Sequence, residues 1–250
     1  MQCCGPKDMD RQQFPPKGIL CQNLDLNLEQ VVRKLGEAES SDVYAYVLHT
    51  VSCDKDKDQL LQTGSAPNFQ GDYITLCTCK HYMRSLRPVD CWKNVWIAGF
   101  SRHEMEDHYL FYLMQVERAF KSFRDLWEAS TSDTKEAKDA SKNRLGDLYR
   151  PISSNNGDDF SIHSYKPPME GHVHHQDYLL RKDIEYLNNK NKKATRAALL
   201  VGNPKFSFLW TKPRILFYSP DKKGFHGHWR YPDLQKFLKN LKQRSALKAP

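Results

Sequence analysis

The sequence predicts an α+β fold in which a strongly bent, mainly antiparallel sheet, or a small β-barrel, is flanked by helices. Strand-like runs rich in β-branched and aromatic residues follow one another with short polar links, and helical patterns stand mostly outside that series. Regular alternation of strands with helices, which would indicate a parallel sheet, is not found. The 250 residues can bury a sizeable core without covalent cross-links.

The first elements expected are a helix and a strand. Apolar residues from Leu28 to Leu35 fall at helical spacing and stop at Gly36, which predicts one short helix after a loose arm. The run VYAYVLHTV at 43–51 predicts the first core strand, with both of its faces covered.

Three more strands are expected in the middle of the chain. After a polar loop at 54–71, the run DYITLCTC at 72–79 predicts the second strand. Further strands are predicted at 94–101 and 109–118, and a helix at 122–130.

The last part of the chain predicts irregular backbone followed by regular elements. Pro, Gly and Asn are frequent in the forty residues after Asp147, and irregular surface segments often carry function. AALLVG and PRILFYS then predict strands, and YPDLQKFLKNLKQ predicts a basic helix. We expect an arm with a short helix at 1–40, a single α+β domain at 41–240 and a basic tail at 241–250.

Charge and composition limit the classes of protein to which this chain can belong. The net charge of +8 favours a polyanionic partner, although a solvated basic surface explains it equally well. No apolar run reaches the roughly 18 residues that cross a bilayer, and the N-terminus lacks a secretory signal. The seven scattered cysteines indicate reduced thiols. We therefore expect a cytoplasmic protein without a membrane partner.

The stretch GDYITLCTCKHYMR, residues 71–84, ends a predicted strand in cysteines and cations. It allows a metal half-site, a nucleophilic thiol or an anion-binding strand end. Cys77 and Cys79 are separated by one residue and would lie about 7 Å apart on one strand face, which is a poor zinc chelate. We predict no bound metal, cysteines that pack in the core, and a phosphate site at Lys80 and Arg84.

Histidines form a second cluster. EGHVHHQD and GFHGHWR each contain a His-x-His pair, which could supply acid and base groups or, less favourably, metal ligands. A base within hydrogen-bond reach of the substrate is the first requirement for acid–base chemistry. The catalytic candidates are Asp147, Tyr149, His174, His175 and Asp177.

Glycine-rich phosphate loops and Gly-x-Ser-x-Gly are absent, which gives no support to nucleoside triphosphatase, dinucleotide-binding or α/β-hydrolase functions. Cations instead alternate with aromatic residues at 80–87, 90–96, 209–214 and 225–231. Such pairs hold a phosphodiester and an unstacked base together, although cations lying over the edge of an aromatic core look the same in sequence. The nucleic-acid-binding candidates are Lys80, Arg84, Trp92, Trp96, Trp229 and Arg230.

The order of motifs over 43–240 resembles the type 2 family of nucleotide modification associated domains of bacteria and phages. The most specific pieces are TLCTCK with Arg84, and GDLYRP. The chain departs from that family at His81, where proline is usual, and at 91–93, where a Gly-Asp turn is common. A looser likeness at the level of the fold is to PUA-like barrels, including EVE domains, which bind modified or flipped bases.

The resemblance implies a protein that recognises or modifies a base in a bacterial or phage DNA modification or defence system. An enzyme, a binding module and a non-catalytic interaction subunit of a larger complex all stay open. Nucleic acid or a nucleotide is the expected partner, together with proteins of such a system, and whether a cofactor is used stays unknown.

Lys80 and Arg84 are four residues apart and share a face whether the chain is helical or extended. As exposed phosphate contacts, their joint replacement by glutamine should leave the fold intact and weaken the salt dependence of nucleic-acid binding.

Overall fold

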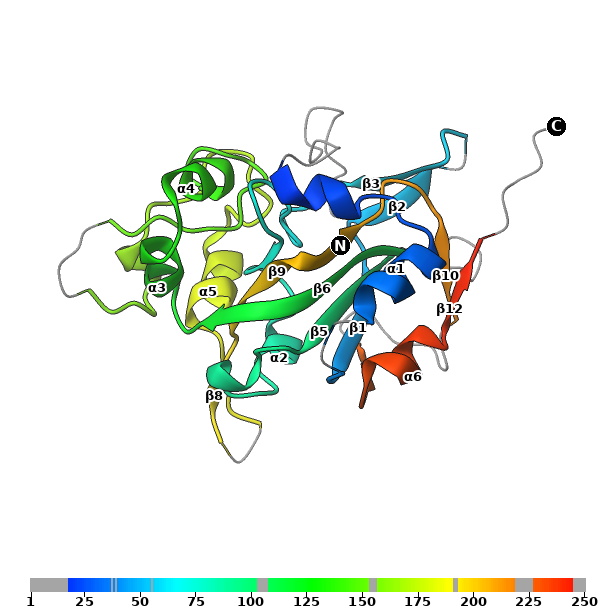
Figure 1. Cartoon of the computed structure of the whole chain (residues 1–250). Coiled ribbons are helices and arrows are strands. Elements are labelled where there is room, and N and C mark those ends of the chain that lie inside the picture. The colour runs from blue at the N-terminus through cyan, green and yellow to red at the C-terminus, as the bar shows by residue number, and fades with distance from the viewer. Residues whose placement is uncertain are drawn as a thin grey trace.

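The chain folds around a strongly curled sheet that forms a half-barrel, with helices placed around it (Figure 1). The computed structural model describes residues 18–36, 38, 40–54, 56–102, 108–152, 157–190, 193–218 and 227–244. The α+β fold with a bent, mainly antiparallel sheet is confirmed. Within these residues, no helix is long and apolar enough to cross a membrane.

The main sheet has eight strands, and β6 (His108–Phe120) is its centre. Along the principal path the order is β11-β1-β5-β6-β10-β12, while β9 pairs with the later part of β6 and also with β4. Among the strands that the structure describes in this sheet, β1 and β5 run parallel and the other pairs are antiparallel. The remaining strands of this sheet are β1 (Val43–Leu48), β4 (Thr75–Leu76), β5 (Trp96–Ser101), β9 (Leu199–Leu209), β10 (Ile215–Phe217), β11 (Trp229–Tyr231) and β12 (Leu241–Gln243).

Helices and two small hairpins complete the fold. The pairs β2 (Val51–Asp54) with β3 (Gln59–Gln62) and β7 (Leu187–Asn188) with β8 (Thr195–Arg196) form separate two-stranded sheets. Figure 1 shows α3, α4 and α5 grouped beside one end of β6 and β9, and α6 at the opposite end. The helices are α1 (Leu28–Leu35), α2 (His81–Arg84), α3 (Phe123–Glu128), α4 (Ser132–Lys138), α5 (Asp177–Glu185) and α6 (Leu234–Leu238), with 3-10 turns η1 (Gly18–Asn23), η2 (Val89–Cys91) and η3 (Ile162–Ser164).

Two apolar clusters hold the molecule together. The larger fills the curl of the sheet, and the smaller lies under α3 and α5, around Phe123, Tyr149 and Leu180. β5 and β6 are antiparallel neighbours, and Gly99 lies opposite Tyr112, whose ring covers it so closely that a Cβ atom would lie 2.2 Å from Cε1. A larger residue at 99 would therefore have to displace the buried ring of Tyr112.

Several predicted elements differ from the structure. The strand expected at 72–79 is reduced to Thr75–Leu76, because the backbone turns sharply before α2. The loop expected at 54–71 contains β3, and α4 follows the helix expected at 122–130 in a segment for which no element was predicted. The basic C-terminal helix ends at Leu238, and the next residues form β12. The short helix ending before Gly36 is confirmed.

Candidate active site

Three segments far apart in the sequence meet around the carboxylate of Asp183. The turn into α2 brings Cys79 and His81, the GDLYRP segment brings Tyr149, and the loop before α5 brings His174. Asp183 lies on the buried face of α5, in line with Leu180 and Ile184. A carboxylate on an apolar helix face must be paired, because burying it unpaired costs several kcal/mol.

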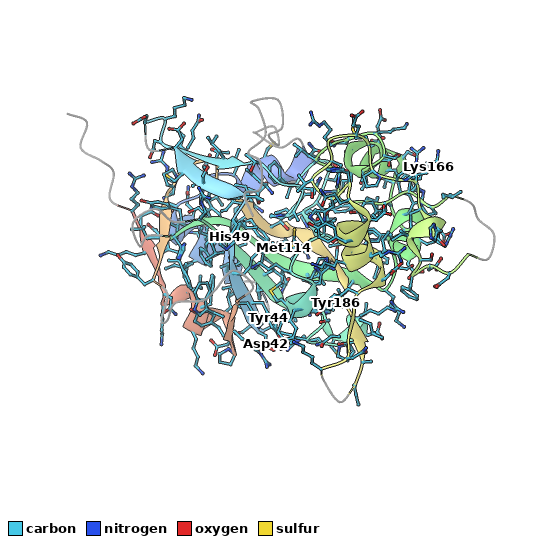
Figure 2. All side chains as sticks on the ribbon, turned by 180° about the vertical axis from the view of Figure 1, so that it is seen from behind. Asp42, Tyr44, His49, Met114, Lys166 and Tyr186 are labelled. Carbon is cyan, nitrogen blue, oxygen red and sulfur yellow. The ribbon has the colours of Figure 1, made fainter. Side chains whose placement is uncertain are left out.

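Asp183 accepts hydrogen bonds from three side chains. Oδ1 lies 2.5 Å from Nε2 of His81, and Oδ2 lies 2.5 Å from Nδ1 of His174. The hydroxyl of Tyr149 donates to Oδ2 over 2.7 Å. The carboxylate is fully enclosed, whereas His81 keeps 16% of its side chain exposed and packs in a tilted arrangement against Tyr186, which is labelled in Figure 2, with 5.5 Å between the ring centres.

The other ring nitrogen of His174 faces a thiol. Nε2 of His174 lies 3.7 Å from Sγ of Cys79, a half-buried residue. The contacts therefore run in series from Cys79 through His174 to Asp183. A nucleophile, a base and a carboxylate that orients the base stand in this order in enzymes that use covalent catalysis.

The backbone at Cys79 takes an uncommon conformation. Cys79 and Lys80 have φ angles of 62° and 47°, in the left-handed region that costs an L-residue about 1–2 kcal/mol. Arg84 supports the turn, because its Nε donates to the carbonyl of Cys79 over 2.9 Å. Its Nη1 donates over 2.6 Å to the carbonyl of Ala198, just before β9. The turn aims the thiol at His174 instead of continuing the strand.

His172 fixes the loop that carries His174. Nε2 of His172 lies 2.7 Å from the carbonyl oxygen of Gly146, and Nδ1 accepts the backbone N–H of His174 over 3.0 Å. Both ring nitrogens are thus used within the fold. His172 is a positioning residue for His174.

The three histidines differ in their electrostatic surroundings. Burial would lower the pKa of His174, but the charges of Asp183 and Cys79 and their hydrogen bonds raise it well above the ordinary value. Burial lowers the pKa of His81, and Asp183 offsets only part of that effect. Burial also lowers the pKa of His172. Although burial acts to raise the pKa of Asp183, the two histidines bonded to it bring that pKa well below its usual range.

These shifts predict different protonation states on neighbouring rings. At about pH 7.5, above the ordinary histidine value of about 6.5, His174 should be an imidazolium while His81 and His172 are neutral. A two-bond 15N–1H correlation spectrum, assigned with single His→Gln variants, measures this directly. Neutral ring shifts for His174 at that pH would contradict the assignment.

Of the residues expected to be catalytic, Tyr149 and His174 lie in this site. Asp147 lies in a separate buried network, where Oδ1 accepts from the Thr75 hydroxyl over 2.9 Å. The ammonium of Lys138 donates to the same hydroxyl oxygen over 3.0 Å, and burial lowers the pKa of Lys138 to about 8. His175 and Asp177 are exposed, and Nδ1 of His175 contacts the carbonyl of His172.

The residues expected to bind nucleic acid differ in burial, from fully buried to exposed. Arg84 is fully buried and bonded to backbone carbonyls, so the expectation of an exposed pair with Lys80 is corrected. Lys80 is half-buried, with Nζ 4.8 Å from the ring centre of Tyr46. Arg230 is exposed. The rings of Trp92, Trp96 and Trp229 are buried in the main core and present no open face for a base.

The expectation that the cysteines pack in the core holds for Cys77, and Cys79 is half-buried and packs against the larger cluster. Cys77 is fully buried in the smaller core cluster. Cys79, His81 and Asp183 were not among the sequence candidates. The available signals were a cysteine with histidines elsewhere in the chain, and an aspartate on the apolar face of α5. Across the residues that the structure describes, no group of three or more His, Cys, Asp or Glu side chains is arranged to hold a metal ion.

Comparisons with family models, with curated proteins and with solved structures find no match to this chain. The function must therefore be argued from the site itself.

Proposed function

We propose that the protein is a thiol-dependent enzyme in which Cys79 is the nucleophile, His174 carries the proton and Asp183 orients His174. The observation that carries this proposal is the contact series, 3.7 Å from Sγ to Nε2 and 2.5 Å from Nδ1 to Oδ2. The thiolate is the reactive form of cysteine, and His174 is the ring that contacts the sulfur and can exchange a proton with it. Tyr149 and His81 hold Asp183 in place.

The proposed reaction is displacement at an electrophilic carbon. The Cys79 thiolate forms a bond to that carbon, and the leaving nitrogen or oxygen departs with the electron pair and takes the proton of His174. Neutral His174 then removes a proton from water while the water oxygen attacks the same carbon. The carbon–sulfur bond breaks, the thiolate is restored and His174 is an imidazolium again.

For the substrate we propose a nucleotide, free or within nucleic acid. The family resemblance of the two segments that meet at Asp183, the net charge of +8 and the Lys80 ammonium next to Cys79 support this choice. An amino group on an electrophilic ring carbon of a base is a group that such a step can displace. The setting would be a bacterial or phage system that modifies DNA or defends against it.

A second candidate is an amide or ester hydrolase that does not act on nucleotides, because the same series of groups serves acyl transfer. A non-catalytic subunit is the third candidate, and it predicts an ordinary thiol at position 79. The reactivity of Cys79 therefore separates an enzyme from a subunit before any substrate is known.

We expect Cys79 to react with limiting iodoacetamide about tenfold faster than Cys91 near pH 7, because an ordinary thiol is only a few per cent ionised there. Cys21 and Cys91 are exposed, whereas Cys79 is only half-exposed, so exposure alone predicts the opposite order. Peptide mapping by mass spectrometry after short reaction times gives the rate for each cysteine.

The matched variants are His174→Gln and His175→Gln, neighbours of which only the first contacts the thiol. His174→Gln should reduce the reaction of Cys79 to the rate of an exposed thiol, and His175→Gln should not. Mixed nucleotides and oligonucleotides would then be screened for a covalent adduct on Cys79 or an altered base. Equal alkylation rates in wild type and His174→Gln would exclude the proposed role of His174.

A further inference from the structure

Three of the four cation–aromatic motifs in the sequence converge on one side of β1. Tyr82 follows Cys79 by three residues, and its ring centre lies 6.3 Å from that of His228. The His228 ring lies 5.7 Å from Tyr44 of β1, which itself packs at 5.2 Å against Trp92. The fourth motif lies elsewhere, since Trp210 is buried and donates to the carbonyl of Leu26.

Two guanidinium groups border this row of rings. Arg87 and Arg230 lie 5.6 and 5.8 Å from the ring centre of Tyr44. Both are paired with the single carboxylate of Asp42, so the group carries one net positive charge. The Arg230 side chain is 58% exposed and Tyr82 is 43% exposed. We call Tyr44, Tyr82, Arg87, His228 and Arg230 the cation–ring strip.

The strip is joined to the segment that carries the thiol through α2 and through the buried ring of Tyr46. Tyr44 and Tyr46 project from the same face of β1, because residues two apart in a strand do so. Lys80 lies over the Tyr46 ring and is next in sequence to Cys79, while Tyr82 stands on the first turn of α2. Figure 2 shows Tyr44 and Asp42 at the same end of β1. A chain lying along the strip could therefore place one unit at Cys79.

We infer that the cation–ring strip binds single-stranded nucleic acid and leads one base of it to Cys79. This inference rests on the proposed function for what happens at Cys79, but the binding itself does not depend on the thiol. The exposed ring of Tyr82 can accept an unstacked base of any sequence, and the half-buried His228 ring lies beside it. The two guanidinium groups of the strip accept phosphates, while Tyr44 is buried and supports the rings and guanidinium groups from below. In a duplex the base faces are already stacked on one another, so the rings select single strands.

The test is fluorescence anisotropy with labelled oligothymidylate and oligouridylate of about twelve nucleotides, and with a duplex of similar length. The variants are Tyr82→Ala and Arg230→Gln. The matched controls are Tyr178→Ala, an exposed ring on α5 with Lys182 over it, and Arg33→Gln, an exposed cation paired with Glu29 on α1. Cys79→Ser is included to separate binding from chemistry.

Wild type should bind the single strands more tightly than the duplex. Tyr82→Ala should weaken single-strand binding by about 5- to 100-fold, as the loss of one stacked base does. Arg230→Gln should reduce the slope of log affinity against log salt by about 0.7, the value for one single-strand phosphate. The two controls and Cys79→Ser should bind as wild type does.

Absence of single-strand binding by wild type, a preference for duplex, or equal losses in the control variants would overturn the inference. Each outcome is independent of the thiol enzyme proposal, because that proposal is measured by the alkylation rate of Cys79. A reactive Cys79 without single-strand binding would leave a thiol enzyme with another substrate. Single-strand binding together with an ordinary alkylation rate of Cys79 would indicate a binding module without thiol chemistry.

Discussion

Replacing Asp183 by asparagine is expected to lower the free energy of unfolding by about 3–5 kcal/mol, the usual cost of removing one partner from a buried ionic network. The carboxylate accepts from three side chains and is itself fully buried. An asparagine has one acceptor oxygen, and its NH2 group would face a donor. The His174 imidazolium would lose the charge that stabilises it.

The same substitution should act on the chemistry. Without Asp183, burial would favour neutral His174, since the Asp183 charge and its hydrogen bond are main reasons why the His174 pKa is raised. A neutral His174 stabilises the Cys79 thiolate less, so alkylation of Cys79 near pH 7 should slow about tenfold. Urea denaturation and the peptide-mapping assay measure the two effects on one protein sample.

Asp177→Asn is the matched control for Asp183→Asn. Asp177 lies on the same helix, in its first turn, and is exposed. Its interaction with the helix dipole is worth less than about 1 kcal/mol, and Nδ1 of His174 is bonded to Asp183 instead. If both variants lost similar stability, the three hydrogen bonds to Asp183 would not be the source of the effect.

The elements predicted well are those whose sequence pattern has one physical cause. The core strands at β1, β5 and β6 are apolar on both faces, and the helix before Gly36 has a regular apolar spacing. The strand predicted at 72–79 was too long, because the strand-forming composition of this segment does not reveal the left-handed turn at its end. Neither Cys79 nor Lys80 belongs to the residue types that favour this conformation.

The site was predicted in part. A dense group of ionisable residues pointed to His174, and the GDLYRP segment pointed to Tyr149. Asp183 joins these to His81, which is 102 positions away in the chain, and no local pattern encodes such a pairing. The tryptophans illustrate the opposite error. Their neighbouring cations suggested open stacking faces, whereas the rings fill the core.

Arg84→Gln is expected to lower the free energy of unfolding by about 2–4 kcal/mol, in contrast to the surface behaviour that its sequence position suggested. Its guanidinium is fully buried and donates to the carbonyls of Cys79 and Ala198, which would be left without those donors. Releasing a buried charge offsets part of the loss. Lys80→Gln, at a half-buried side chain, should cost less than about 1 kcal/mol.

Arg84→Gln also tests whether Arg84 acts by holding the turn at Cys79 or by contacting a phosphate. Arg84 holds the carbonyl of Cys79, and with it the left-handed backbone that aims the thiol at His174. In a folded Arg84→Gln sample the Cys79 alkylation rate should therefore fall toward that of Cys91, while the salt dependence of single-strand binding stays unchanged. Arg84→Lys tests the geometry, because one ammonium cannot reproduce the fixed fork of a guanidinium. If Arg84→Gln changed the salt dependence and left alkylation unaltered, Arg84 would be a phosphate contact after all.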